Sequence, residues 1–362
     1  MTGVLAASDY MERALFLAER GRGRTSPNPM VGAVIVSRDG IVVGQGFHER
    51  AGEAHAEVRA LDMAGGRARG ATLYCTLEPC CHVGRTGPCT ERIVAAGIAR
   101  VVAAVEDPNP LVRGRGFQML RERGIEVDVG LGAGAASRIN GPFFTLTRDG
   151  RPFVVLKAAV SRDWKIAARA GAPTRLTSPA SDRHAHRVRA EVDAIGIGSG
   201  TLLADDPLLT ARGAYRERPL IRVIFDRRLR TPPTARVLST LEAGPVIIVT
   251  STAAAATERA RLLAGRGVEI EPAGTPTFRG ALDRLAKRGI ESLLLEGGAA
   301  VHRAAWDEGL VDFVRLYVAP LELGPGAVPF GIARVSLEGL QNRRVSSIGD
   351  DELIEGYVHG AY

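Results

Sequence analysis

The order of apolar segments along the chain constrains its fold more than any other feature. In the first half, helical patterns alternate with short apolar runs typical of strands. Helices are predicted over residues 9–20, from about Ala54, from about Pro88 and near Phe117. Strands are predicted over residues 31–37, 41–46, 71–77, 100–106 and 125–130. Such alternation predicts a sheet with helices on both faces.

The first helix and the first two strands have local signals of their own. Asp9 and Glu12 have the spacing of a capping box, which places the start of the first helix at Asp9. Gly40 follows Arg38 and Asp39 between the first two strands, as in a glycine-bearing turn. We therefore expect these strands to form a hairpin.

A second alternating series follows a stretch rich in turn signals. Residues 140–152 contain Gly-Pro, Asp-Gly and a further proline, which are typical of turns and domain boundaries. Beyond them, Ser178 and Pro179 predict a helix start. Strands are predicted over residues 152–161, 192–198, 220–226, 245–250, 291–296 and 311–320. We therefore predict two α/β domains, residues 1–147 and 148–362.

Composition and charge limit the cellular locations and the partners that are expected for the protein. The first residues lack a basic region followed by a long apolar stretch, and no window approaches the ~20 apolar residues of a membrane span. We therefore expect a cytoplasmic protein without a membrane partner. The net charge of +7 is spread along the chain, so it is compatible with a nucleic acid or with a small phosphorylated molecule.

The cysteines are clustered. Cys75, Cys80, Cys81 and Cys89 lie within fifteen positions in a chain of 362 residues. This clustering favours a local metal site over a disulfide framework, although disulfides remain an alternative.

One imidazole, two thiols and one carboxylate fall in a short span. His55, Cys80 and Cys89 offer the nitrogen and sulfur ligands that zinc accepts, and three protein ligands leave the fourth position of a catalytic zinc to water. Glu57 is then available to move protons, as in the zinc deaminases with an H-x-E motif. A structural zinc site is the alternative, but such sites normally have four ligands in paired short spacings.

This ligand set makes structural demands. Residues two apart do not share a helix face, so His55 and Glu57 reach one metal only if a helix begins there. Cys89 is expected at a helix start after Pro88, where amide dipoles favour a thiolate. Cys81 is awkwardly placed for a fourth ligand, and Cys75 lies in a strand pattern typical of the core.

At this point the chain resembles the bifunctional deaminase/reductase family of riboflavin biosynthesis over almost its whole length. In the first half the motifs are Thr25-Ser26-Pro27-Asn28-Pro29, Gly46-Phe47-His48, His55-Ala56-Glu57 and residues 76–89, TLEPCCHVGRTGPC. The long spacing between the two cysteines separates this family from tRNA and free-cytidine deaminases. The resemblance implies a cytidine-deaminase-like α/β/α domain.

The resemblance also implies roles in binding the deaminase substrate. Asn28, His48 and His82 would hold the pyrimidine, and Arg85 would lie near its phosphorylated tail. From the residues alone, Asn28 could equally form a turn between prolines, and the two histidines could be surface loop residues. The chain departs from the family pattern at Cys81, commonly serine, and at Gly87, commonly proline.

The second half resembles the dihydrofolate-reductase-like domain of the same family. The motifs are Lys157-Ala158-Ala159-Val160-Ser161, Lys165-Ile166-Ala167, residues 188–194, Gly200-Thr201, residues 205–212 and Leu295-Glu296-Gly297-Gly298. The resemblance implies that NADPH contacts Ala159, Thr201, Asp205 and the turn from Gly298 into the next helix. It implies a substrate site formed by Arg189, Leu209, Arg212 and Glu296.

Three departures fall in this second half. Trp164 stands where the family usually has a glycine, in a turn that favours positive φ. Arg175 stands where a tryptophan usually lies near the cofactor, and Pro173 stands where a serine is expected near the substrate.

The expected function follows from this resemblance. The first domain would deaminate 2,5-diamino-6-(5-phosphoribosylamino)pyrimidin-4-one with zinc, and the second would reduce the ribosyl group of the product to ribityl with NADPH. We expect a homo-oligomer, with a dimer favoured, and no stable nucleic-acid partner. The alternatives are a monofunctional deaminase with a degenerate, dimerising second domain, and a nucleic-acid-editing deaminase whose affinity would fall steeply with salt.

Overall fold

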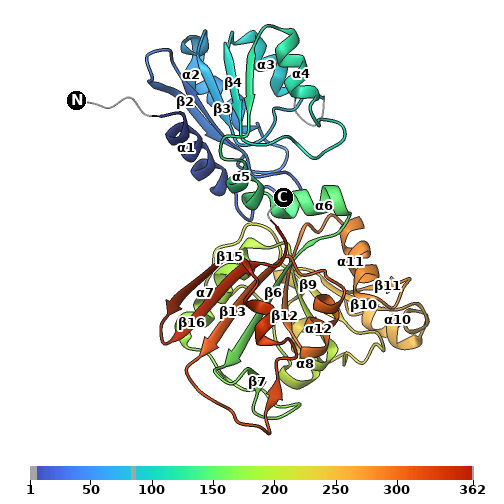
Figure 1. The fold of residues 1–362 in the computed structure, drawn as a ribbon. Helices are drawn as coiled ribbons and strands as arrows, with labels where there is room; N and C mark the ends of the chain where they lie inside the picture. Colours follow the sequence, from blue (N-terminus) through green and yellow to red (C-terminus); the bar gives the residue numbers. More distant parts are fainter. Residues whose placement is uncertain (1–5, 83–86, 361–362) are drawn as a thin grey trace. The chain divides into compact units, whose positions relative to one another are not determined.

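The computed structural model describes residues 6–82 and 87–360 (Figure 1). The chain divides into two compact units, one ending at Asp149 and the other spanning Gly150–Gly360. The division falls two residues after the boundary at 147 that the turn signals suggest.

The first unit contains a five-stranded sheet in the order β2-β1-β3-β4-β5. Its strands are β1 (Gly32–Val36), β2 (Val42–Phe47), β3 (Thr72–Cys75), β4 (Arg100–Ala103) and β5 (Glu126–Val129). The helices are α1 (Ala7–Glu19), α2 (Ala56–Ala64), the 3₁₀ turn η1 (Gly65–Ala68), α3 (Cys89–Ala95), α4 (Arg115–Glu122), α5 (Ala133–Ile139) and α6 (Gly141–Asp149). The β1–β2 hairpin is antiparallel as predicted, whereas β3, β4 and β5 are parallel.

Both faces of this sheet are covered by helices. Successive residues of a strand point to opposite faces, and in β1 Ala33 and Ile35 pack in a core with α2, α3 and α4. Val34 and Val36 pack in a second core with α1 and α5. The apolar run of β1 is therefore buried on both sides, which confirms the predicted two-faced sheet.

Two local predictions in this unit were wrong. Helix α1 begins at Ala7, and the Asp9 carboxylate accepts a hydrogen bond from the Ala6 amide at 2.8 Å, so Asp9 lies inside the first turn rather than at the cap. Residues 141–149 form helix α6 rather than a loop. Pro142 is tolerated there because amides of a first turn have no helical partner, and the turn signals mark the two ends of the helix.

The second unit contains a nine-stranded sheet in the order β11-β10-β9-β8-β12-β6-β13-β16-β15 and a small β14-β7 pair. Its strands are β6 (Phe153–Ser161), β7 (Lys165–Ala167), β8 (Ala194–Gly198), β9 (Ile221–Phe225), β10 (Val246–Ser251), β11 (Val268–Ala273), β12 (Ser292–Gly297), β13 (Phe313–Ala319), β14 (Val328–Pro329), β15 (Gln341–Ile348) and β16 (Asp351–Tyr357). Strands β11 to β13 in this order are parallel, and β15 and β16 are antiparallel additions.

Helices cover both faces of the parallel part. They are α7 (Pro179–Glu191), α8 (Ser199–Asp205), η2 (Arg236–Ala243), α9 (Thr252–Ala255), α10 (Glu258–Ala264), α11 (Phe278–Lys287), α12 (Ala299–Asp307) and η3 (Arg334–Leu337). In β12, Leu293 and Leu295 pack with α11 and α12, while Leu294 packs with α7, α8 and α10. Helix α7 starts as predicted, with the Ser178 side chain accepting from the Ser181 amide and Pro179 at the first position.

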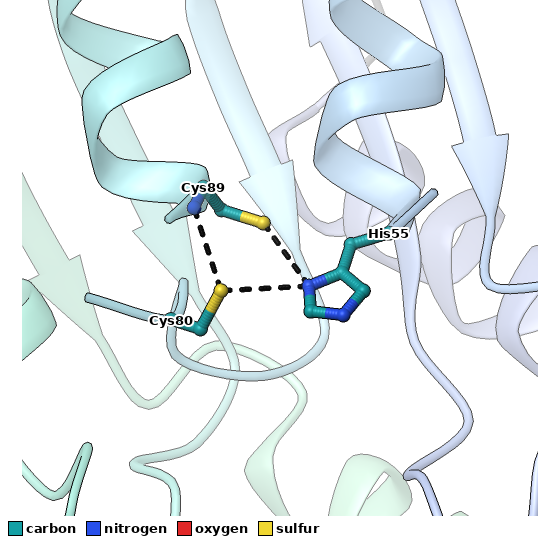
Figure 2. A group of neighbouring side chains, drawn as sticks. All are labelled: His55, Cys80 and Cys89. Carbon is teal, nitrogen blue, oxygen red and sulfur yellow. Dashed lines mark hydrogen bonds between the residues drawn. The ribbon is translucent and has the colours of Figure 1, made fainter. Parts of the chain in front are cut away.

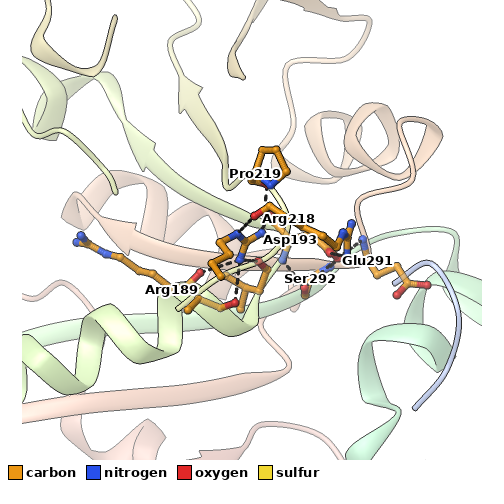
Figure 3. Close-up of polar contacts among 9 residues, drawn as sticks. Arg189, Asp193, Arg218, Pro219, Glu291 and Ser292 are labelled. Atoms are coloured by element: carbon orange, nitrogen blue, oxygen red, sulfur yellow. Dashed lines mark hydrogen bonds and ion pairs between the residues drawn. The ribbon is translucent and has the colours of Figure 1, made fainter. Parts of the chain in front are cut away.

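A buried aspartate joins the starts of two neighbouring strands (Figure 3). The Asp193 carboxylate accepts hydrogen bonds from the amides of Glu291 and Ser292, at 3.0 and 3.1 Å, and pairs with Arg218 at 2.9 Å. These bonds fix β8 beside β12 and hence align their carboxyl ends. Ligands of parallel α/β sheets bind at that edge.

The strands that were not predicted from the sequence are β7, β11, β14, β15 and β16. Residues 341–347 of β15 are all exposed, so this strand lacks the apolar pattern on which the prediction depended. Within the described residues, no helix combines the length and apolar character needed to cross a bilayer.

Candidate functional site

Three predicted metal ligands converge in the first unit (Figure 2). Nδ1 of His55 lies 3.4 Å from Sγ of Cys80 and 3.2 Å from Sγ of Cys89. The ligand atoms of all three residues lie within 4.8 Å of one another. One nitrogen and two sulfurs around a common point fit a zinc ion with an open fourth position.

Two helix starts bring these side chains together, as predicted from the sequence. His55 is the N-cap of α2, in extended conformation, so its side chain and that of Glu57 in the first turn lie at the same helix end. Cys89 is the first residue of α3 after Pro88 at the N-cap. The amide of Cys89 donates to Sγ of Cys80 at 3.4 Å, as expected of a helix start that favours a thiolate.

The electrostatics of the cluster favour one thiolate and one protonated thiol. A hydrogen bond from Cys89 lowers the pKa of Cys80 to about 4, assisted by His55. The same hydrogen bond raises the pKa of Cys89, and burial adds to this increase. The bond to Cys80 also raises the pKa of His55. A cation at the centre would replace these shared protons.

Glu57 is buried against this cluster. Only 3% of it is exposed, and its carboxyl shares a hydrogen bond with Cys89. Burial raises the pKa of Glu57 to about 7. In this position the carboxyl can exchange a proton with a group bound beside the cluster.

A cavity of about 350 Å³ opens onto these residues. The predicted residues in its lining are Asn28, His48, His55, Glu57, Cys80 and His82. Cys89 is fully buried and does not line the cavity. Arg85 lies outside the described residues.

Asn28 and His48 are linked in the cavity wall. Nδ1 of His48 lies 3.3 Å from the Ala54 carbonyl oxygen, so this nitrogen is the donor and Nε2 is an acceptor. Nδ2 of Asn28 lies 3.1 Å from Nε2 and donates to it. Burial lowers the pKa of His48, which keeps the ring neutral in this arrangement. Oδ1 of Asn28 has no partner among the described residues.

Several residues of the cavity wall were not predicted from the sequence. Those with polar side chains are Glu53, Glu78, Asp107 and Asn109, and Phe143 adds an aromatic ring. Glu78 accepts from four backbone amides, those of Asp107, Gly114, Gly116 and Phe117. The Asp107-Pro108-Asn109 turn after β4 was the signal that could have revealed this wall, since polar residues at the carboxyl end of a strand often face a site.

In the second unit, two of the predicted substrate residues form a buried ion pair. Nε and Nη2 of Arg189 each lie 2.7 Å from an oxygen of Glu296. Lys157 lies 3.7 Å from the same carboxylate. Burial raises the pKa of Glu296, but the positive charges of Arg189 and Lys157 outweigh it and lower the pKa to about 2. The guanidinium of Arg189 therefore binds Glu296. The lowered pKa keeps Glu296 ionised at neutral pH.

The glycine turn after β12 fits a phosphate-bearing cofactor. Gly298 has φ of 91° and is the N-cap of α12, which has no side-chain cap. A Cβ at Gly297 or at Gly298 would lie 3.0 Å from the Thr201 side chain, which is closer than most Cβ contacts, and the positive φ of Gly298 further disfavours any other residue there. A helix N-terminus without a side-chain cap, next to a glycine turn, is a site for an anion such as the NADPH phosphates.

The other predicted reductase residues are distributed around this sheet edge and beyond it. Ala159 lies on β6 and Asp205 ends α8. Leu209 is buried with φ of 54°, and Nη1 of Arg212 donates to the Thr210 hydroxyl at 3.2 Å. Arg175 has a side chain that is 72% exposed and pairs with Asp182 at 3.3 Å.

Trp164 adopts the strained conformation that the sequence predicted for its turn. Its φ is 61°, and its ring lies 6.4 Å from that of Phe330. Its carbonyl accepts from the Phe330 amide at 3.0 Å. The turn is further held by Asp163, which accepts from the amides of Leu323 and Gly324. Packing and hydrogen bonds therefore offset the strain of a non-glycine residue.

Comparison with known proteins agrees with this division of the chain. Residues 6–105 match the cytidine and deoxycytidylate deaminase zinc-binding region, and residues 152–353 match the RibD C-terminal domain. The riboflavin biosynthesis protein RibD of Aquifex aeolicus is 41% identical over 96% of this chain and 97% of its own length.

Solved structures agree over the whole chain. RibD of Acinetobacter baumannii matches with a TM-score of 0.85 and 37% identity, covering 97% of this chain and 98% of that one. A diaminohydroxyphosphoribosylaminopyrimidine deaminase/5-amino-6-(5-phosphoribosylamino)uracil reductase of Thermotoga maritima matches with a TM-score of 0.83 and 34% identity, with the same coverage. The chain therefore belongs to the RibD family of riboflavin biosynthesis, whose members combine a deaminase and a reductase.

Proposed function

We propose that residues 1–147 deaminate 2,5-diamino-6-(5-phosphoribosylamino)pyrimidin-4-one and that residues 148–362 reduce the ribosyl group of the resulting 5-amino-6-(5-phosphoribosylamino)uracil to ribityl. The observation that carries the first step is the convergence of three metal-binding side chains beside a cavity that is lined by two of them and by the buried carboxyl of Glu57. The family supplies the pairing of this step with a reduction.

In the deamination, His55, Cys80 and Cys89 would hold a zinc ion, which when bound would supply a water molecule with a pKa lowered towards ~7. The Glu57 carboxylate takes a proton from the attacking water and transfers it to the departing amine nitrogen. Its burial beside Cys89 supports this role, because it places an acid/base group at the metal without using it as a ligand.

The cavity wall orients the pyrimidine. The bond from Nδ2 of Asn28 to His48 leaves Oδ1 of Asn28 as an acceptor for an N–H of the ring. His48 and His82 contribute further to the ring's site, and Arg85 binds the phosphorylated tail. Correct placement of the reacting carbon near the metal is itself a large part of catalysis.

In the reduction, Gly298, Thr201, Ala159, Asp205 and Arg175 would hold NADPH, which when bound would supply a hydride for the sugar carbon. Arg189, Leu209, Arg212 and Glu296 hold the substrate. The Arg189–Glu296 pair supports this role, because it places a fixed carboxylate at the carboxyl end of β12, beside the glycine turn.

Mass spectrometry of the product, with and without NADPH, tests both steps. We expect the diaminopyrimidine to exchange an amine for an oxygen, and to gain two hydrogens only when NADPH is present. Glu57→Gln should reduce deamination by about 10²–10⁴-fold while zinc remains bound, and exposed Glu91→Gln is its matched control. A product that is deaminated but never reduced would contradict the proposed second step.

We further propose that the protein acts in the cytoplasm on this small phosphorylated pyrimidine rather than on a nucleic acid, and that it is a homodimer. The exposed edge strand β15 supports an association, because an unpaired edge can pair with a second copy. Light scattering after size-exclusion chromatography tests the dimer. A monomer at micromolar concentration would contradict it.

A further inference from the structure

Asn140 joins two distant parts of the first unit. It lies between α5 and α6, and only 2% of it is exposed. Its Oδ1 accepts from the Met30 amide at 2.7 Å, and its Nδ2 donates to the Met30 carbonyl at 2.9 Å. The side-chain amide of Asn140 therefore bonds both the N–H and the C=O of Met30, as a neighbouring strand would. Met30 lies in the 27–31 segment, 110 positions away in the sequence.

The main chain of Asn140 is also held. Its amide donates to the Ala136 carbonyl at 3.1 Å, and its carbonyl accepts from the Phe144 amide at 2.9 Å. One hydrogen bond therefore leads back into α5 and the other into α6. With both ends of the side chain also bonded, Asn140 fixes Met30 relative to these two helices.

Residues on both sides of this contact line the deaminase cavity. Asn28, Pro29 and Val31 flank Met30, and Phe143 lies in the first turn of α6. Neither Met30 nor Asn140 lines the cavity. Asn140 therefore holds two parts of the cavity wall together without contacting what the cavity contains.

We propose that Asn140 is a positioning residue for the deaminase: its side-chain amide fixes Met30 and thereby places Asn28 for the pyrimidine. The inference rests on the proposed function, in which Asn28 binds the ring. Without this contact, the segment would gain freedom, and Asn28 would reach its bonded position beside His48 less often. A binding site that must first be ordered has a weaker apparent affinity.

The two hydrogen bonds between Asn140 and Met30 determine which variants test the proposal. Asn140→Asp keeps the shape of the side chain but places a second acceptor opposite the Met30 carbonyl. Asn140→Gln keeps the amide but adds a methylene, which shifts both hydrogen bonds. Exposed Gln118→Glu, on α4 of the same unit, is the matched control for an added carboxylate.

The test is a double-mutant cycle in the full-length zinc protein. Asn28→Ala and Asn140→Asp should each raise the deaminase KM by about tenfold or more, with a smaller change in kcat. The double variant should be no worse than Asn28→Ala, because residues that act through one another are not additive. Zinc content and NADPH-dependent reduction should stay at the wild-type level, as should the zinc content and deaminase kinetics of Gln118→Glu.

Other outcomes overturn the inference and separate it from the proposed function. If Asn28→Ala raises KM but Asn140→Asp does not, or if their effects multiply, Asn140 does not act through Asn28, whose own role stands. If Asn28→Ala leaves KM unchanged while Glu57→Gln stops deamination, the role of Asn28 fails, and this inference fails with it. If Asn140→Asp loses zinc, the cycle is run with Asn140→Gln, and loss of zinc there too shows a purely structural role.

Discussion

Arg189 and Glu296 form a two-point ion pair inside the second unit, although they are 107 positions apart in the sequence. Their side chains are 15% and 6% exposed, and both N–O distances are 2.7 Å. Each charge of a buried ion pair stabilises the other, because a buried charge without its partner loses its hydration and gains no counter-charge. The pair therefore links α7 to the end of β12.

Replacing one partner of this pair should be costly. We expect Glu296→Gln to lower the free energy of unfolding of the second unit by about 3–5 kcal/mol, because Arg189 and Lys157 lose their counter-charge. The exposed pair of Arg279 and Asp283 offers a control, and Asp283→Asn should change stability by about 0.3–0.5 kcal/mol. Urea unfolding measures both, and equal effects would contradict the prediction.

Cysteine variants distinguish the metal ligands from their neighbours. Cys89→Ser should lose most of its zinc and its deaminase activity and retain NADPH-dependent reduction, because the cluster belongs to the first unit. Cys81→Ser should keep its zinc and its deaminase activity, since the sulfur of Cys81 is outside the cluster. Metal analysis after dialysis measures the difference. Full zinc occupancy in Cys89→Ser would contradict the ligand set, and a strong chelator should reproduce the loss in the wild-type protein.

Stability should depend on pH through His302. Burial lowers the pKa of His302 to about 4 from 6.5, while Nε2 bonds to the Leu295 carbonyl at 3.1 Å. Below 6.5 the unfolded chain binds a proton that the folded chain does not, so stability falls as the pH decreases from 6.5 towards 4. The slope for one group is at most about 1.4 kcal/mol per pH unit.

His302→Gln removes this titration. Its amide can still donate to Leu295, so we expect a shallower loss of stability between pH 6.5 and 5 than in the wild-type protein. Urea midpoints at several pH values measure the slopes. Identical slopes in the two proteins would show that His302 does not titrate on unfolding.

Two variants of Trp164 can separate the contribution of its packing to stability from the cost of its backbone strain. Trp164→Gly loses the contact with Phe330 but relieves the positive φ, whereas Trp164→Ala loses the contact and keeps the strain. We expect Trp164→Ala to be less stable than Trp164→Gly by about 1 kcal/mol. Thermal unfolding of the three proteins provides the comparison, and the reverse order of the two variants would show that the strain is negligible.

Local patterns were sufficient for much of the fold and for the metal cluster. Alternating apolar segments predicted both α/β units, and the helix starts at His55 and Cys89 followed from the demands of a shared metal. These features depend on neighbouring residues and on ligand chemistry, both of which are visible in a sequence. Strand β15 was missed for the same reason, because its exposed residues carry no apolar pattern.

Tertiary structure alone decided how distant residues combine. The sequence resemblance implied that Arg189 and Glu296 each contact the substrate, and only the folded structure showed that they bind each other. Asn140 looked like part of a boundary loop, yet it lies inside a helical junction and holds Met30. A side chain's partner across 100 or more positions depends on strand order and helix packing, which its own neighbours in sequence do not encode.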